Sequence, residues 1–324
     1  MIRPIIHRLS SEQYHHGEEE SRYLSSSQLK WYAKSPRYAR LRLDNPEDET
    51  EKSDALRLGD LFHSMMQWCA HKESSEFEKK ILGWVGFRLA VFEPPVNEKT
   101  GKPYGVLSNV FKEAYEEFNS RHRTDSVVTA EVRDTLLAMG RSLILGNGAT
   151  SAQVRNLLKW ARAAEVSCFY ETEDGIRLKV RPDLLTRDKI VDWKTCSLDS
   201  LDEESIARQI IKYRYDVSLS MYQHVLHEIG GKWYTPILVF VQKQPPFDAV
   251  MCDISEWCYS YDEAGDYVNP GVGALEFRRL LDLHTECVKK NEWPGAESAI
   301  EADGNVRVMR PGVPAWFGYR YFGM

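Results

Sequence analysis

Residues 177–196, RLKVRPDLLTRDKIVDWKTC, are the stretch that decides the fold. Apolar and polar residues alternate on both sides of the tetrad TRDK, which is typical of two strands joined by a four-residue loop. With that loop, Leu185 lies opposite Ile190, and the same register places Asp183 opposite Asp192. Opposed side chains have Cβ atoms about 5 Å apart, where like charges are destabilising unless a cation lies between them. The pattern therefore predicts a metal site.

Lys194 joins this carboxylate pair. Side chains alternate along a strand, so Asp192 and Lys194 point to the same face. A lysine beside a metal-bound water can orient or deprotonate it, or can neutralise charge that develops on a phosphate. Oxygen ligands favour Mg²⁺, with Mn²⁺ able to substitute, over zinc. A lone Asp-x-Lys triplet is more often just the solvated face of a strand, so only the whole arrangement indicates a functional site.

A third carboxylate precedes the pair by one strand. A three-residue turn at 173–175 (EDG) would place Glu165 opposite Asp183, whereas a two-residue Asp-Gly turn would shift the register. We expect Glu165, Asp183, Asp192 and Lys194 on one face of a strand meander that begins at Glu165.

The remaining periodicities predict helices around this sheet. Apolar residues recur at helical spacing in 58–69, 110–164, 200–212, 216–229 and 273–291, and two short helices separated at Ser35-Pro36 are predicted in 25–43. Residues 236–241 and 247–253 read as a buried strand and its hairpin partner, whereas 44–54 and 93–109 read as surface loops. We expect an α/β fold with a central mixed β-sheet flanked by helices. It forms one domain, 1–324, divided into a mainly helical region (1–160), a sheet core (161–260) and a C-terminal helix and tail (261–324).

Composition excludes several classes of protein. The six cysteines form no CxxC pair, which argues against a zinc knuckle or a disulfide framework. A net charge of −6 argues against a general nucleic-acid coat protein, although an acidic chain can carry a local basic groove. No stretch approaches the roughly 18 apolar residues that span a bilayer, and the N-terminus lacks a secretory apolar run. We expect a soluble cytoplasmic protein with no membrane partner.

With these residues in place, the sequence resembles the RecE-type phage exonucleases. This PD-(D/E)xK nuclease family includes the C-terminal domain of exodeoxyribonuclease VIII. The resemblance covers most of the chain and rests on SSSQLKWYAKSP, ALRLGDLFH, EVSCFYE, RPDLL, IVDWKT, the helix beginning at Tyr215, and RPGVPAWF. It implies a restriction-endonuclease-like core preceded by a helical region.

The resemblance also assigns roles to the site residues. It implies that Asp183 and Asp192 ligate a catalytic magnesium, that Lys194 acts on the attacking water, and that Glu165 and His63 complete the catalytic and metal-binding set. Gly59-x-x-x-His63 is similar to the GxxxH motif of RecB-like nucleases, in which the histidine approaches a second metal. Without that motif, a histidine beside an apolar stripe would be interpreted as a core residue.

The sequence departs from the family at one position. Relatives commonly carry Gln three residues after the tyrosine that matches Tyr215, but this chain has Ser218 there, and Gln223 follows further along. The shorter serine puts DNA contact or site closure at that position in doubt. The C-terminal cysteine cluster of iron–sulfur variants is missing, so no cluster is predicted.

Basic residues near the carboxylates are candidates for phosphate contacts. They are Arg177, Lys179 and Arg181 on the strand, Arg208, Lys212 and Arg214 on the next helical segment, and Gln223 as a polar addition. Taken singly, each cation is better explained as a solubilising charge, whereas the strand triplet Arg177, Lys179 and Arg181 beside the carboxylates favours phosphate contacts. Lys30, Lys34, Arg37, Arg40 and Arg42 could extend a DNA channel in which Trp31 and Tyr32 stack on bases or else belong to the core.

These features predict a magnesium-dependent exodeoxyribonuclease. The resemblance implies 5′ to 3′ resection of linear double-stranded DNA from its ends, a ring-shaped homo-oligomer, and phage recombination beside a single-strand annealing protein in the bacterial cytoplasm. The alternatives are a structure-specific or Cas4-like nuclease of the same superfamily, or a non-catalytic DNA-binding module.

Overall fold

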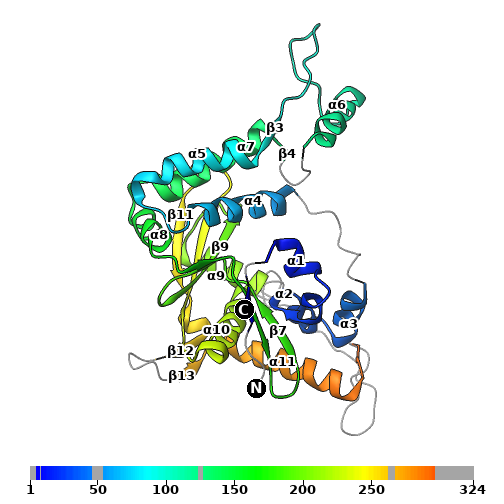
Figure 1. The fold of residues 1–324 in the computed structure, drawn as a ribbon, viewed down its shortest axis with the longest axis vertical. Helices are drawn as coiled ribbons and strands as arrows, with labels where there is room; N and C mark the ends of the chain where they lie inside the picture. The colour runs from blue at the N-terminus through cyan, green and yellow to red at the C-terminus, as the bar shows by residue number, and fades with distance from the viewer. Residues whose placement is uncertain (1–4, 8, 46–53, 123–126, 262–266, 296–324) are drawn as a thin grey trace, which may run out of the picture.

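A five-stranded mixed sheet forms the centre of the protein (Figure 1). The computed structural model describes residues 5–7, 9–45, 54–122, 127–261 and 267–295. The strand order is β11-β10-β9-β8-β5, and only β9 and β10 run parallel. The strands are β5 (Ala163–Ala164), β8 (Leu184–Leu185), β9 (Lys189–Cys196), β10 (Thr235–Gln242) and β11 (Ala249–Asp253). The predicted mixed sheet and the pairing of Leu185 with Ile190 are confirmed.

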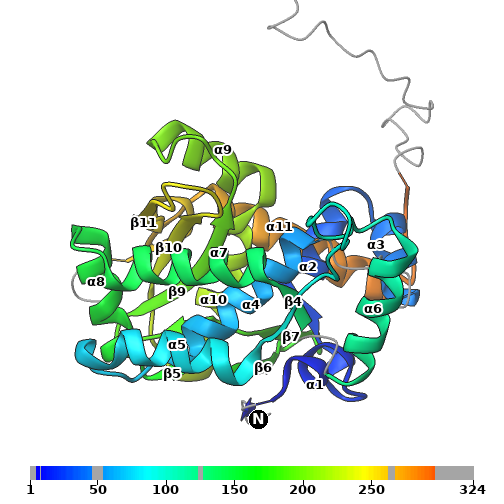
Figure 2. The same ribbon diagram turned by 90° about the horizontal axis from the view of Figure 1, so that it is seen from above.

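Alternation along β9 gives this sheet two different faces. Val191 and Trp193 enter one apolar core, and Ile190 enters the other, on the face that also carries Asp192 and Lys194. Helices cover both faces (Figures 1 and 2). The Trp193 side is covered by α4 (Asp54–Cys69), α5 (Phe77–Arg88), α7 (Ala130–Gly140) and α8 (Ala149–Lys159), and the Ile190 side by α10 (Tyr215–Gly230) and α11 (Val272–Lys290).

The predicted single meander is wrong, because it divides between two sheets. The second sheet has the order β1-β6-β7-β2. Its strands are β1 (Ile5–His7), β2 (Leu24–Ser25), β6 (Ser167–Glu171) and β7 (Arg177–Val180). Pro182 lies between β7 and β8, and proline has no amide hydrogen with which to continue a ladder. The chain therefore changes sheets there.

The register between β6 and β7 agrees with the three-residue turn at 173–175. Cys168 pairs with Val180, and the amide of Thr172 donates to the carbonyl of Ile176. Continued past the last pair, this register brings Glu165 beside Asp183, and the Glu165 amide donates to the Asp183 carbonyl at 3.1 Å. The local turn thus carries a carboxylate to the end of β8.

The N-terminal segment covers the basic face of β7. Lys179 is 2% exposed and donates to the backbone carbonyls of Tyr14 and Glu20, at 2.7 and 2.9 Å. These acceptors belong to α1 (Ser11–His16) and to the 3-10 turn η1 (Glu20–Arg22). Burial lowers the pKa of Lys179 to about 8. The expectation that Lys179 contacts DNA is therefore wrong, since its ammonium group joins two parts of the fold.

Helices α4, α9 (Glu203–Tyr213), α10 and α11 agree with predicted segments, whereas α1 and α5 fall in no predicted segment. Ser25 and Ser35 cap two short helical pieces in 25–43, and Pro36 opens the second. Strand β4 interrupts the segment 110–164 that was predicted as helical. The additional elements are α2 (Ser26–Leu29), η2 (Lys30–Ala33), α3 (Pro36–Asp44), η4 (Ser74–Glu76), β3 (Ala90–Phe92), α6 (Asn109–Ser120), β4 (Val127–Thr129), η6 (Arg141–Leu145), η7 (Ser255–Trp257), β12 (Tyr259–Tyr261) and β13 (Tyr267–Pro270).

Two further sequence expectations have different outcomes. Between α5 and α6, the predicted loop 93–109 contains only an isolated bridge, between Val96 and Pro103. Most of the predicted acidic loop (46–53) and the motif RPGVPAWF lie outside the described residues. In the described part of the chain, no helix has the length and apolar character needed to cross a membrane.

Gln223 joins α10 to two segments of the core. Its side chain is 0% exposed, and its Nε2 donates to the carbonyls of Tyr234 and Tyr259, at 2.7 and 3.1 Å. Its Oε1 accepts the amide hydrogen of Tyr259 at 3.0 Å. The predicted DNA contact of Gln223 is thus wrong, because all of its hydrogen bonds are internal.

We expect Gln223→Ala to lower the free energy of unfolding by about 2–4 kcal/mol, because it leaves buried backbone groups without partners. Urea unfolding followed by circular dichroism measures the change. Gln67→Ala, at an exposed position of α4, is the matched control and should be nearly neutral. Normal stability combined with lost DNA affinity in Gln223→Ala would restore the DNA-contact role.

Candidate active site

Asp183 lies where the β8–β9 ladder ends. The last backbone pair of the ladder is Leu184 with Val191. Asp183 precedes Leu184 in the chain, and its side-chain Oδ2 accepts the amide hydrogen of Trp193 on β9 at 2.7 Å. A side chain thus replaces the missing backbone partner. The side chain of Asp183 is 10% exposed, and its Oδ2 also lies 3.3 Å from Nδ1 of His63.

His63 approaches from α4, which runs against β9. One turn earlier, Gly59 faces that strand, and a Cβ placed on it would lie 3.6 Å from the Thr195 hydroxyl. His63 itself is 26% exposed at its side chain and is not part of the apolar core. The GxxxH spacing therefore puts the backbone contact and the imidazole on the same side of the helix.

Glu165 completes a group of three possible metal ligands. Its backbone is left-handed, with φ of 52°, which is unusual for a residue other than glycine. Its carboxylate accepts a hydrogen bond from Nε of Arg181 at 2.7 Å. One ligand atom each from His63, Glu165 and Asp183 lies within 4.8 Å of the other two.

Asp192 and Lys194 form a separate pair beside this group. Nζ of Lys194 lies 2.5 Å from Oδ2 of Asp192 and 4.9 Å from the centre of the Tyr215 ring. Their side chains are 8% and 19% exposed. Asp192 therefore does not share the three-residue group, and its carboxylate is compensated by lysine.

The charges in this cluster shift one another's pKa values. Burial raises the pKa of Glu165, and the Asp183 carboxylate raises it further. Burial also raises the pKa of Asp192, against the attraction of Lys194. For Asp183, burial acts to raise the pKa, but His63, the charge of Lys194 and the Trp193 amide together outweigh burial, so the pKa lies below its ordinary value. Conversely, burial acts to lower the pKa of His63, but Asp183 outweighs it and raises that pKa to about 9.

The chemistry of this group fits a divalent cation. Two carboxylates and one imidazole lie within bridging distance of a single ion, and the raised pKa of Glu165 reflects the cost of holding both charges in a buried place. Oxygen-rich ligand sets suit magnesium or manganese. His63, Glu165 and Asp183 are the residues placed to hold such an ion, with Asp192 at its border.

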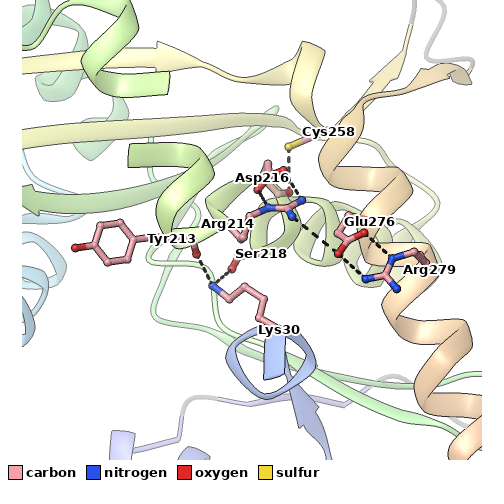
Figure 3. Close-up of polar contacts among 8 residues, drawn as sticks. All are labelled: Lys30, Tyr213, Arg214, Asp216, Ser218, Cys258, Glu276 and Arg279. Atoms are coloured by element: carbon pink, nitrogen blue, oxygen red, sulfur yellow. Dashed lines mark hydrogen bonds and ion pairs between the residues drawn. The ribbon is translucent and has the colours of Figure 1, made fainter. Parts of the chain in front are cut away.

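Lys30 brings a second cation toward the Asp192–Lys194 pair. Its Nζ donates to the Tyr213 carbonyl and to the Ser218 hydroxyl, both at 3.0 Å (Figure 3). The charges of Lys194 and Asp192 act on its pKa, although burial is the largest cause of its lowering to about 8. Ser218 is thus an acceptor for a lysine from η2. The sequence grouped Lys30 with other N-terminal cations but did not place it beside Lys194.

The other predicted phosphate ligands divide into paired and exposed groups. Arg214 donates twice to Asp216, each time at 3.0 Å, and reaches Glu276 at 3.9 Å, which also pairs with Arg279 (Figure 3). The side chain of Asp216 is 3% exposed, so Arg214 compensates a buried charge at the α9–α10 junction.

Among the strand cations, Arg177 pairs with Glu171, and Arg181 holds Glu165 and also donates to the carbonyls of Leu9 and Ser10. Arg208, which pairs with Glu204, and Lys212 are exposed on α9. These two are therefore the members of the predicted set that face solvent most openly.

The ion pair between His63 and Asp183 makes stability depend on pH in metal-free protein. Because the pKa of His63 rises from 6.5 to about 9 on folding, the stabilisation is complete below pH 6.5 and is lost as the pH approaches 9. In EDTA, we expect the free energy of unfolding of wild type to fall by on the order of 3 kcal/mol between these two pH values, relative to that of His63→Gln. Denaturant unfolding at several pH values measures this loss, with His122→Gln, an exposed histidine just after α6, as the control. Equal slopes of unfolding free energy against pH in wild type and His63→Gln would contradict the pairing.

Comparison with known proteins places this site in a family. The family model described as a PDDEXK-like domain of unknown function (DUF3799) matches residues 25–302. No curated protein matches. One solved structure, a candidate exonuclease from Eubacterium rectale, is 17% identical over 98% of this chain and 100% of that chain, with a TM-score of 0.44. The predicted PD-(D/E)xK relationship is confirmed, whereas the RecE-type assignment remains a prediction. The protein belongs to the DUF3799 family of PDDEXK-like domains.

Proposed function

We propose that this protein is a magnesium-dependent deoxyribonuclease that hydrolyses phosphodiester bonds. The observation that carries the proposal is the convergence of His63, Glu165 and Asp183 within 4.8 Å, next to the buried pair of Asp192 and Lys194. The PDDEXK-like family assignment supports the same chemistry. A purely structural ion network would not need three carboxylates in one partly buried place.

The residues of this chain divide the work. His63, Glu165 and Asp183 would hold the ion, and Asp192 would add a further anionic ligand. When bound, the ion supplies an activated water and neutralises charge on the phosphate. Arg181 orients Glu165 through its 2.7 Å hydrogen bond, and the Trp193 amide orients Asp183.

Lys194 is the group best placed to act on the water or the phosphate. Its Nζ is fixed between the Asp192 carboxylate and the face of Tyr215. Burial acts to lower its pKa, but Asp192 and Asp183 outweigh this and raise it, so the amine stays protonated. A protonated amine stabilises developing negative charge on phosphate oxygens rather than removing a proton.

DNA would approach over α9 and η2. Arg208 and Lys212 are exposed on α9, and Lys30 lies between the α9–α10 turn and Lys194. Such contacts supply affinity without sequence preference. We propose double-stranded DNA ends as substrate, 5′ to 3′ polarity, a ring-shaped homo-oligomer and a single-strand annealing partner, all resting on the RecE-type resemblance. A structure-specific or Cas4-like nuclease is the alternative within the superfamily, and a non-catalytic DNA-binding module is the alternative outside it.

Substitutions separate metal binding from chemistry. We expect Asp192→Asn to weaken binding of Mg²⁺ or Mn²⁺ about 10-fold or more and to abolish cleavage. Lys194→Ala should lower single-turnover cleavage about 10²–10⁴-fold while the metal still binds. Because Asp192→Asn leaves the buried Lys194 ammonium without its carboxylate partner, it should also lower the thermal stability of metal-free protein.

Calorimetric metal titration and single-turnover cleavage, with melting temperatures for each variant, test these assignments. Asp174→Asn and Lys290→Ala are exposed controls that should behave as wild type. Unchanged metal affinity in Asp192→Asn would remove its ligand role. Normal cleavage by folded Lys194→Ala would remove lysine from the catalytic set.

Substrate ends distinguish the exonuclease from its rivals. We expect cleavage of end-labelled linear duplex with magnesium and none of covalently closed, unnicked plasmid, because the resemblance is to enzymes that act from ends. Lys194→Ala purified in parallel controls for contaminating nuclease. Rapid cutting of closed plasmid, or preference for flapped duplex, would favour the structure-specific alternative, and no cleavage of any substrate would favour the binding module.

A further inference from the structure

A hollow of about 790 Å³ lies beside the β8–β9 turn, away from the carboxylates. Its apolar floor includes Leu157, Ala161 and Met251, which belong to or border the core on the Trp193 side of the sheet. Asp192 and Lys194 project from the opposite face of β9. This site is therefore distinct from the candidate active site.

The indole of Trp160 lines this hollow and is exposed to solvent. Trp160, directly after α8, is 67% exposed. Nζ of Lys159 lies 5.3 Å from its ring centre. Exposing a tryptophan to this extent forfeits a large gain from apolar burial, so a planar ligand that stacks on the ring would recover it.

Two guanidinium groups beside the indole have no ionic partner. Arg162 and Arg187 both line the hollow and are exposed, and neither forms an ion pair with any residue in the described ranges. The two lysines there are compensated, Lys159 by Glu73 at 3.0 Å and Lys189 by Asp188 at 2.7 Å. The free positive charge of this surface thus comes from the two arginines, in a chain whose net charge is −6.

Exposed amides complete the set of donors and acceptors. Gln153 and Asn156 line the same hollow from α8 and are both exposed. Amide side chains donate and accept, as the edges of nucleobases do. An open aromatic face, unpaired arginines and amides together match a base and its phosphates, whereas a simple phosphate ion would leave the indole unused.

We propose that this hollow binds a segment of single-stranded nucleic acid, with one base stacked on Trp160 and phosphates on Arg162 and Arg187. The proposal rests on the proposed function in that a nuclease of this kind would expose such a strand. The turn lies three residues, about 10 Å along β9, from Asp192, so a strand a few nucleotides long can reach both places. Duplex DNA cannot present an unstacked base and would not use this site.

Binding is measured without cleavage, using the full chain in EDTA and a short fluorescein-labelled oligothymidine, with fluorescence anisotropy as readout. We expect Trp160→Ala to weaken binding about 5- to 100-fold and Trp160→Phe to restore most of it. Arg162→Ala/Arg187→Ala should lower the slope of log affinity against log salt by about 1.4, since each phosphate contact contributes about 0.7 for a single strand. Affinity for a duplex of the same length should stay unchanged in all three variants.

Matched controls keep the test specific to this hollow. Phe87→Ala removes an equally exposed ring elsewhere, and Lys79→Ala/Lys112→Ala removes two exposed cations. Unchanged oligothymidine affinity in Trp160→Ala and in the double arginine variant would overturn the proposal. The proposal would also be overturned if Trp160→Ala changed the mass of the protein in analytical ultracentrifugation but not its oligothymidine affinity, because Trp160 would then lie at a contact between two copies of the chain. Cleavage is scored separately on linear duplex, so loss of Trp160-dependent binding and loss of nuclease activity are distinguishable results.

Discussion

The hydrogen bond from the Trp193 amide to Oδ2 of Asp183 is the contact on which the candidate site depends. The chain leaves one sheet at Pro182, and the ladder between β8 and β9 stops at Leu184. Because β9 is a central strand buried on both faces, the Trp193 amide would otherwise lack a hydrogen-bond partner. By accepting that hydrogen, Asp183 is fixed against β9, and the same oxygen lies 3.3 Å from His63 on α4. A requirement of the backbone thus sets the position of the first metal-ligand candidate.

Each carboxylate of the cluster is matched by a cation of the protein itself. His63 pairs with Asp183, Arg181 with Glu165, and Lys194 with Asp192. Removing one member of such a buried pair leaves its partner uncompensated, which costs more than the pair contributes. A divalent ion would compete with these internal cations, so its binding is linked to the proton on His63 and to the positions of Arg181 and Lys194.

Internal partners of several cations also change where the DNA surface is expected. The basic strand β7 seemed suited to phosphates, but Lys179 is buried under residues 9–23 and Arg181 is committed to Glu165. Arg214 likewise compensates Asp216. Arg208 and Lys212 on α9 and the arginines of the Trp160 hollow remain exposed, in segments far apart in the sequence. Lys30 is committed to Tyr213 and Ser218.

Local patterns were enough to predict the helices α4, α9, α10 and α11, the strands from β6 to β11 and the register of the β8–β9 turn, but not α5 or the short strands β1 to β5. Side-chain alternation and turn length are properties of neighbouring residues, so Leu185 opposite Ile190 follows from the chain itself. The sequence left two turns open at 173–175, and the structure has the three-residue turn, which brings Glu165 beside Asp183. Two things were decided by tertiary structure alone: the change of sheet at Pro182 and the partner of each charge. Lys179, Gln223 and Arg214 look like surface polar groups in the sequence, and they acquire internal partners only when distant segments fold over them. Burial depends on what packs above a residue, and the sequence around that residue does not contain this information.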